Sequence, residues 1–290
     1  MKLSHNRAVL LMVAVTLMWS TAGVVTRHLE AARSFEVTFW RSAFTALSLL
    51  VILPIFQGRQ VFRQIRQGSA AFWTSGVCWS VMFTSFMLAL TLTSVANVLV
   101  TMSIGPLLTA VLAWVFIGHR IPMRTWIAIV VAGAGMAYMY AAEVGEASLV
   151  AILVTLCVPL GGAVNWTLTQ HAHAQGQDVD LVPAVLVGAV ISSVVTLPMA
   201  FPFQTTSHDL ALLAFLGLGQ LAIPCVLSVL CARVLKAPEI ALLALLEVVF
   251  GILLAWLGAH EVPRASVLVG GLVVIGALLG NELIGWRNRK

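Results

Sequence analysis

Charged residues are scarce in this sequence of 290 residues: Asp, Glu, Lys and Arg make up 9% of it, and hydrophobic residues make up 60%. Soluble domains carry about 25% charged residues, because a water-facing surface needs them. This shortage excludes an interpretation as soluble domains, which the length alone would permit. The mean hydropathy of +1.01 indicates a chain whose surroundings are mostly lipid.

Other absences narrow the possible functions. The four cysteines, Cys78, Cys157, Cys225 and Cys231, lack C-x-x-C spacing, so they indicate neither a disulfide framework nor a zinc site. The sequence contains no P-loop motif and no long polar insertion, so no ATP-hydrolysing domain or ATPase subunit is implied. A net charge of +5 without a soluble basic domain argues against a nucleic-acid partner.

Long charge-free segments are the main feature that is present. A bilayer core about 30 Å thick requires roughly 20 apolar residues of helix. The segments are apolar on all sides, whereas the strands of membrane barrels alternate polar and apolar residues. We therefore predict an all-α integral membrane protein with ten transmembrane helices, at about 8–28, 36–56, 71–91, 95–117, 124–142, 147–170, 181–201, 209–231, 238–258 and 265–285.

The basic residues predict the orientation of these helices, since Lys and Arg are enriched in cytoplasmic loops. With both termini inside, twelve of the sixteen Lys and Arg residues fall in inner segments and three, Arg27, Arg33 and Arg264, in outer ones. Arg41 lies within a predicted span. The distribution supports a multi-pass protein with cytoplasmic N- and C-termini.

Two halves are indicated by weak internal similarity at a shift of about 141 residues, which places His119 opposite His260 and Gly135 opposite Gly276. Five is an odd number, so a second set of five helices starts on the opposite side of the membrane, as in the inverted repeats of transporters. We predict two inverted five-helix repeats, residues 1–142 and 143–290.

Several short motifs resemble the EamA family. Leu246-Glu247 matches its "Leu-Glu-Pro" element with Val248 in place of the proline, and His260-Glu261 follows where "Gly-Glu" is usual. The first half has Gly105-Pro106 and then Gly118-His119 at the same distance. Further matches are Trp19-Ser20 and Trp40-Arg41.

This resemblance implies the fold of the drug/metabolite transporter (DMT) superfamily: ten helices in two inverted repeats that move small metabolites. Within the family the chain is most similar to amino-acid exporters of the YddG type, which implies a location in the bacterial inner membrane. Val248 and His119 depart from the family pattern, so roles tied to the usual residues do not carry over to them.

A transporter site is expected where helices are interrupted at corresponding depths, because the freed backbone groups then face a cavity. Gly105-Pro106, Pro159–Gly162 and Pro224 predict such breaks, and polar stripes follow the same helices. Glycine, proline and hydroxyl residues also serve helix packing in membranes, which is the competing interpretation. The predicted substrate-binding residues are Trp19, Ser20, Trp79, Phe83, Asn97, Thr101, Pro106, Gly161, Asn165, Trp166, Gln220, Pro224 and Ser228.

Two charges, Arg41 and Glu247, lie deep within predicted spans rather than near their ends. Glu247 shares a helix face with small residues, and an ionisable group inside a membrane is a functional candidate, here for proton coupling. A purely structural Glu247–Arg41 pair is the alternative. Arg41 lies one turn into its helix and is expected to reach the outer interface by snorkelling, which favours a structural role.

The predicted function is a secondary transporter that exports amino acids or related small metabolites by alternating access, with the lipid bilayer and a small-molecule substrate as its partners. No cofactor, metal or catalytic residue is predicted; His171-Ala-His173 is a weak metal motif because its two histidines point to different helix faces. An integral membrane enzyme and a channel-like protein are the alternatives. The substrate, the coupling ion and the oligomeric state remain open at this stage.

Overall fold

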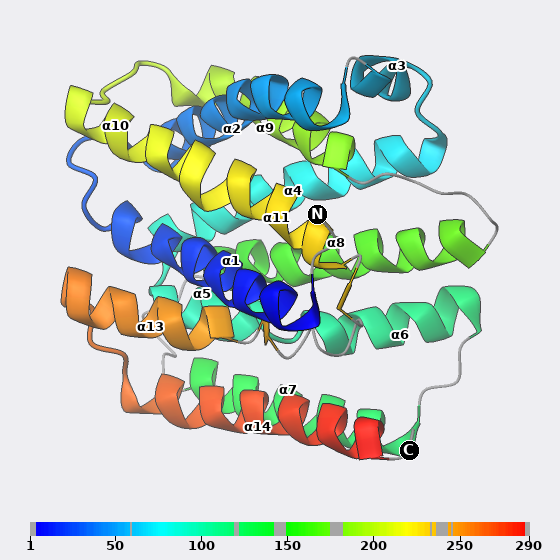
Figure 1. The fold of residues 1–290 in the computed structure, drawn as a ribbon. Helices are drawn as coiled ribbons and strands as arrows, with labels where there is room; N and C mark the ends of the chain where they lie inside the picture. The colour runs from blue at the N-terminus through cyan, green and yellow to red at the C-terminus, as the bar shows by residue number, and fades with distance from the viewer. Residues whose placement is uncertain are drawn as a thin grey trace.

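The computed structural model describes residues 4–58, 60–118, 122–141, 149–174, 182–232, 234–235, 243–244 and 246–287. Over these residues the secondary structure is helical, with no strand (Figure 1). The helices are α1 (His5–Thr26), α2 (Ser34–Gln57), α3 (Gln60–Arg66), α4 (Ala70–Leu92), α5 (Val95–Met102), α6 (Gly105–Ile117), α7 (Met123–Ala141), α8 (Leu149–Ala174), α9 (Val182–Ala200), α10 (Ser207–Phe215), the π-helix η1 (Leu216–Ala222), α11 (Ile223–Ala232), α13 (Leu246–Ala259) and α14 (Ala265–Arg287).

Seven helical stretches are long and apolar enough to cross a membrane: His5–Thr26, Ser34–Gln57, Ala70–Leu92, Val95–Phe116, Pro183–Ala200, Ser207–Ser228 and Ala265–Gly285. Three shorter apolar helices, Met123–Met139, Leu149–Asn165 and Leu246–Ala259, lie at the other expected crossings. The prediction of an all-helical, multi-pass membrane protein is confirmed. The first part of the ninth expected span, before Leu246, lies largely outside the described residues.

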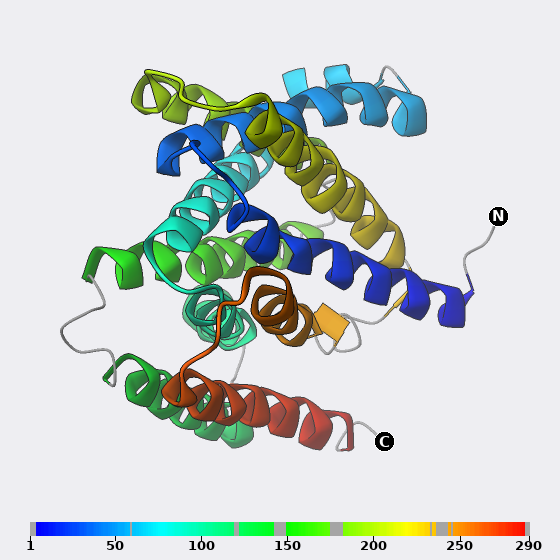
Figure 2. The same cartoon turned by 90° about the vertical axis from the view of Figure 1, so that its left-hand side faces the viewer.

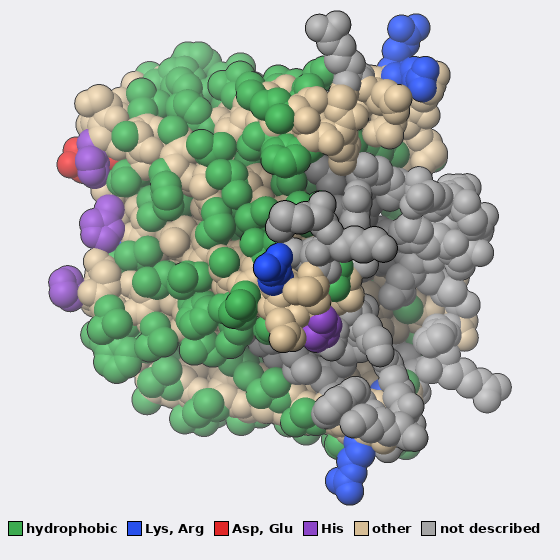
Figure 3. All heavy atoms as spheres, viewed as in Figure 1, with side chains coloured by type: hydrophobic (Ala, Val, Ile, Leu, Met, Phe, Trp, Pro, Cys, Tyr) green, Lys and Arg blue, Asp and Glu red, His purple; other side chains and the backbone are tan. Residues whose placement is uncertain are grey.

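The surface has the character of a lipid-facing one. Large apolar side chains such as Phe56, Phe116 and Leu257 are about three-quarters exposed. In Figure 3 hydrophobic side chains are spread over the visible face beside the grey residues, whereas the visible acidic side chains and most of the visible histidines gather at the left-hand end. An apolar belt of this kind is what a bilayer requires of a helical bundle.

Local signals in the sequence fix several helix ends. The Ser69, Ser94 and Thr206 side chains each accept a hydrogen bond from a backbone N–H in the first turn of α4, α5 and α10. The boundary between the third and fourth predicted spans therefore falls where α4 ends at Leu92 and α5 begins at Val95, which we call the α4–α5 hinge. Gly118 ends α6 with a φ of 72°, a left-handed conformation that glycine adopts without strain.

Helices from the two halves of the chain interleave rather than forming separate bundles. α2 packs along α9, α4 along α8 and α9, α1 along α13, and α7 along α14. Figures 1 and 2 both place α7 and α14 side by side at one edge of the molecule. A Cβ atom added to Gly270 of α14 would lie 2.7 Å from the Gly135 carbonyl of α7, so the two backbones meet closely there.

Of the three expected helix interruptions, the one at Gly105-Pro106 is found: α5 ends at Met102 and α6 starts at Gly105 with Pro106 in its first turn. The eighth span stays helical, with the π-helix η1 between α10 and α11 just before Pro224. The break expected at Pro159–Gly162 is wrong: α8 runs unbroken from Leu149 to Ala174 with Pro159 inside it. Proline costs one backbone hydrogen bond in a helix, and helices packed in a membrane tolerate that loss.

Candidate functional site

A buried polar centre forms where α1, α2 and η1 meet. The Arg41 side chain of α2 is buried, and its Nε and Nη2 both donate to Oε1 of Gln220, at 3.2 and 2.7 Å. The Gln220 amide nitrogen in turn donates to the Trp19 carbonyl oxygen at 3.1 Å. Arg41 is 1% exposed, so the expectation that it snorkels to the outer interface is wrong. One deep cation thus joins three helical segments.

Aromatic rings and a carboxylate surround this guanidinium. Its central carbon lies 5.9 Å from the centre of the Phe83 ring and 5.6 Å from that of Phe86, both on α4 and both within cation–π range. Glu247 of α13 and Cys225 of α11 lie near enough to Arg41 for their ionised forms to interact with it electrostatically. The centre therefore holds a cation and an ionisable carboxyl group among apolar neighbours.

Small residues bring α13 close to this centre, as its sequence predicts. The Ser20 hydroxyl of α1 donates to the Glu247 backbone oxygen at 3.1 Å and to the Thr16 carbonyl at 2.7 Å. A Cβ atom added to Gly251 would collide with a Leu99 methyl group. α13 is thus held against α1 and α5 with the Glu247 side chain partly buried.

A chain of hydroxyl groups lies next to Arg41 along α2. The Ser42 and Thr84 oxygens each lie 2.9 Å from the Ser192 hydroxyl, which links α2, α4 and α9. Thr45 donates to the Gly217 carbonyl at 3.2 Å. Sequence reasoning missed these contacts and Phe86; the signal for Arg41 was its position as one of two charges deep within the predicted spans.

The structure brings together part of the predicted substrate-binding set. Three predicted residues, Trp19, Trp79 and Phe83, belong to one apolar cluster beside Gln220, which also contains Cys225, and the Trp79 and Phe83 ring centres are 5.5 Å apart. Pro224 is buried at the start of α11. Ser228 donates to its own helix, to the Cys225 carbonyl at 2.9 Å. Of the predicted residues, Gln220 and Phe83 thus lie directly against Arg41, and Trp19 is linked to it through Gln220.

The remaining predicted residues lie elsewhere. Asn165 of α8 accepts a hydrogen bond of 2.6 Å from Ser75 of α4, and Gly161 packs against Met82. Asn97 and Thr101 are buried on α5, whereas Pro106 is exposed. The Trp166 side chain and the His171 and His173 side chains lie outside the described residues. The predicted residues therefore do not form one site: some lie at the Arg41 centre, and others lie between α4 and α8 or on α5.

The end of the molecule predicted to face outward is tied by a clasp, which we define as Arg27 and Glu261 with their backbone partners. Arg27 Nε donates to Glu261 at 2.6 Å, and its two terminal nitrogens donate to the Leu90 and Thr93 carbonyls. The other Glu261 oxygen accepts from the Val95 N–H at 2.7 Å. The clasp joins the end of α1, the α4–α5 hinge and the loop before α14.

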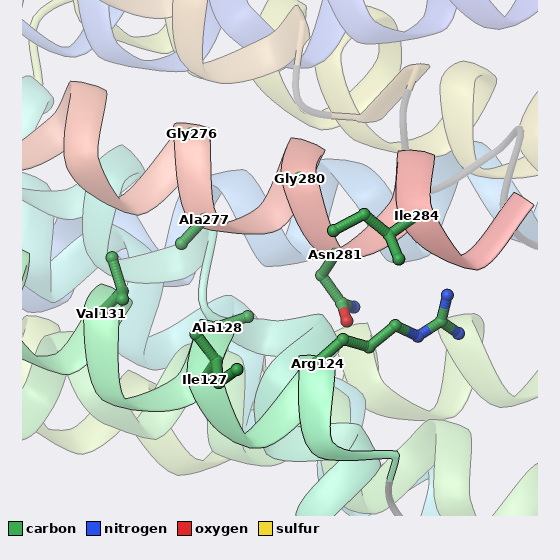
Figure 4. Close-up of a pocket in the computed structure, with 9 residues that line it drawn as sticks. All are labelled: Arg124, Ile127, Ala128, Val131, Gly276, Ala277, Gly280, Asn281 and Ile284. Carbon is green, nitrogen blue, oxygen red and sulfur yellow. The ribbon is translucent and has the colours of Figure 1, made fainter. Parts of the chain in front are cut away.

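The pocket drawn in Figure 4 lies away from this centre, between α7 and α14. Arg124 and Asn281 line one end of it, and small and apolar residues line the rest. Its walls come from two helices at the edge of the molecule (Figure 2). It contains none of the predicted site residues, so it does not identify the substrate site.

Glu30, His208 and Asp209 form an acidic group with ligand atoms within 4.8 Å of one another. Glu30 and His208 are exposed, and both Asp209 oxygens already accept backbone N–H groups. We therefore assign no metal to this group.

The fold and the buried centre define a multi-pass helical membrane protein with an ionisable core. Residues 6–141 match the EamA-like transporter family, so the chain contains an EamA-like transporter domain. Members of this family are membrane transporters of the DMT superfamily rather than enzymes. The match supports the resemblance of the first-half motifs, whereas Leu246-Glu247 and His260-Glu261 lie outside the matched residues.

Comparison with the curated proteins gives no match. Among solved structures, one described as "Crystal structure of protein" aligns over 99% of this chain and 100% of its own, with a TM-score of 0.61 and 17% identity. At that identity the likeness shows the fold alone.

Proposed function

We propose that this protein is a secondary transporter of the YddG type that exports amino acids or related small metabolites across the bacterial inner membrane by alternating access. The observation that carries the proposal is the buried Arg41 centre, built from α1, α2 and α4 of the first half and η1, α11 and α13 of the second. Ionisable groups inside a membrane mark substrate or ion pathways. A site between repeats is where alternating access places its substrate.

Ten crossings in two inverted repeats, residues 1–142 and 143–290, form part of this proposal. The first five are α1, α2, α4, α5–α6 and α7, and the second five are α8, α9, α10–α11, α13 and α14. When each helix is replaced by its equivalent in the other half, the contact of α1 with α13 corresponds to the contact of α8 with α6. In the same way, the contact of α4 with α8 corresponds to the contact of α11 with α1. The pairs α2–α9, α5–α13 and α7–α14 map onto themselves. Such exchange symmetry is what a two-fold axis in the membrane plane requires.

The orientation with cytoplasmic termini also stands as a proposal, and the basic residues support it. It places the clasp and the α1–α2 loop outside, and the chain termini inside. Because the clasp links segments of both halves, opening the outer side requires its separation. The described geometry therefore suits a state that is closed on the outer side.

Glu247 is the group that we propose for proton coupling. It lies in the first turn of α13, is partly buried, and interacts electrostatically with Arg41. Gain or loss of its proton changes the charge balance of the centre, which provides a physical route from a pH gradient to the packing of α13 against α1.

Flux measurements with the purified chain in proteoliposomes test this function. We expect labelled amino acids with apolar side chains to move, and a pH gradient to accelerate them. Glu247→Gln should leave a folded protein whose flux no longer responds to the gradient. Glu30→Gln, which removes an exposed carboxylate, is the matched control and should behave as the wild type.

Absence of flux for the whole amino-acid panel would refute the proposed substrate class. An unchanged pH response in Glu247→Gln would refute only the coupling role. The two parts of the proposal therefore fail separately.

A further inference from the structure

Arg41 has more hydrogen-bond donors than the protein satisfies. A guanidinium carries five N–H donors. Nε and Nη2 share a single neutral acceptor, Gln220 Oε1, and Nη1 is buried with no hydrogen-bond partner. An unsatisfied buried donor is costly, and more so when it carries charge. A side chain that is 1% exposed obtains no compensation from bulk water.

The remaining neighbours do not supply an acceptor for Nη1. Within the described part of the chain Arg41 forms no ion pair, although Glu247 is near enough to interact electrostatically. The rings of Phe83 and Phe86 contribute cation–π contacts, which have no directional acceptor. The guanidinium is therefore held on one edge by Gln220 and left with donor capacity at Nη1.

A purely structural role for residue 41 would not require a guanidinium group. A lysine or a neutral side chain could link α2 to the Gln220 carbonyl, whereas a guanidinium is suited to a planar carboxylate with two oxygens. Trp19, Phe83 and Phe86 provide apolar surface at the same place. The local chemistry matches a molecule with an apolar body and a carboxylate group.

We propose that Nη1 of Arg41 binds the carboxylate of the transported molecule, with the apolar body of that molecule against the aromatic side chains. A zwitterionic amino acid has no net charge, so it adds none to the centre when its carboxylate binds Arg41. This inference rests on the proposed transport function and deepens it by naming a carboxylate as the recognised group.

Binding of four related probes to the purified full-length chain tests the assignment. The probes are L-phenylalanine and 3-phenylpropionate, which carry a carboxylate, and L-phenylalaninamide and 2-phenylethylamine, which do not. Quenching of the intrinsic tryptophan fluorescence reports binding, since Trp19 lies beside the centre. We expect the wild type to bind L-phenylalanine at least about tenfold more tightly than L-phenylalaninamide, as the charge-assisted hydrogen bond predicts. The same difference is expected between 3-phenylpropionate and 2-phenylethylamine.

Three variants separate recognition from structure. Arg41→Gln should reduce to about one the ratio of the affinity for L-phenylalanine to that for L-phenylalaninamide. Arg41→Lys should keep this ratio above one, because the positive charge persists. Arg63→Gln removes an exposed cation of α3 and should leave the ratio unchanged. Equal weakening of all four probes in Arg41→Gln would indicate a structural Arg41 and overturn the proposal.

The wild-type ratio is informative even if Arg41→Gln does not fold. A wild type that binds none of the four probes, or that binds the amide as well as the acid, overturns the proposal. Flux of the amine without flux of the acids would overturn the carboxylate assignment and leave the transporter intact. Preferential acid binding without flux of any probe would support Arg41 recognition and contradict transport.

Discussion

At the scale of single residues, buried carboxylates stabilise the α10 side of the molecule. Asp209 accepts the Glu30, Ala31 and Ala32 N–H groups at 2.8, 3.0 and 2.9 Å. Glu36 accepts the N–H groups of Gln204 and Thr205 and the Thr205 hydroxyl. Each carboxylate thereby connects a loop to a helix start that is distant in sequence.

We predict that Asp209→Ala lowers the free energy of unfolding by about 3 kcal/mol, because three buried N–H groups lose their acceptor. Asp209→Asn retains one acceptor oxygen and should cost less. Thermal unfolding in detergent measures both changes. His208→Ala, at the exposed neighbouring position, is the control and should stay within about 0.5 kcal/mol of the wild type. A full-length Asp209→Ala protein as stable as this control would contradict the assigned role.

At the scale of helices, the length of the apolar segments was sufficient to predict most elements. The Gly105-Pro106 dipeptide predicted where the fourth span breaks, and the structure adds the Ser94 cap at its start. The unbroken α8 was not predictable from Pro159, because packing decides whether a helix continues through a proline. The burial of Arg41 was likewise not predictable from the sequence, since its acceptor Gln220 lies 179 residues further along the chain.

The clasp is an element-scale contact, and its strength can be measured with Arg27→Gln, Glu261→Gln and the double variant. The two side chains are 29% and 21% exposed, so we expect a coupling energy of about 1 kcal/mol, with solvent screening limiting its size. Thermal unfolding of the four proteins provides the cycle. Additive effects would show that the ion pair contributes nothing beyond the separate backbone hydrogen bonds.

At the scale of the whole molecule, stability depends on contacts between the halves rather than within each. α7 and α14 are the clearest case, since each packs mainly against the other at the edge of the bundle (Figure 1). Sequence similarity between the halves predicted that Gly135 and Gly276 occupy equivalent positions, but it did not predict which glycines touch. Their environments differ: a Cβ on Gly135 would lie 3.0 Å from the Gly270 carbonyl, whereas one on Gly276 would meet no described atom within 4 Å.

We therefore predict opposite outcomes for two glycine-to-alanine changes on the same helix. Gly270→Ala places a methyl group 2.7 Å from the Gly135 carbonyl oxygen, so α7 and α14 must separate, at a cost of about 1–3 kcal/mol. Gly276→Ala meets open space and should be neutral or stabilise the protein by up to about 1 kcal/mol through helix propensity. Circular dichroism during thermal unfolding in detergent distinguishes them. Equal unfolding temperatures of the two variants would mean that α7 and α14 do not meet closely at Gly270, and that the two halves pack together elsewhere.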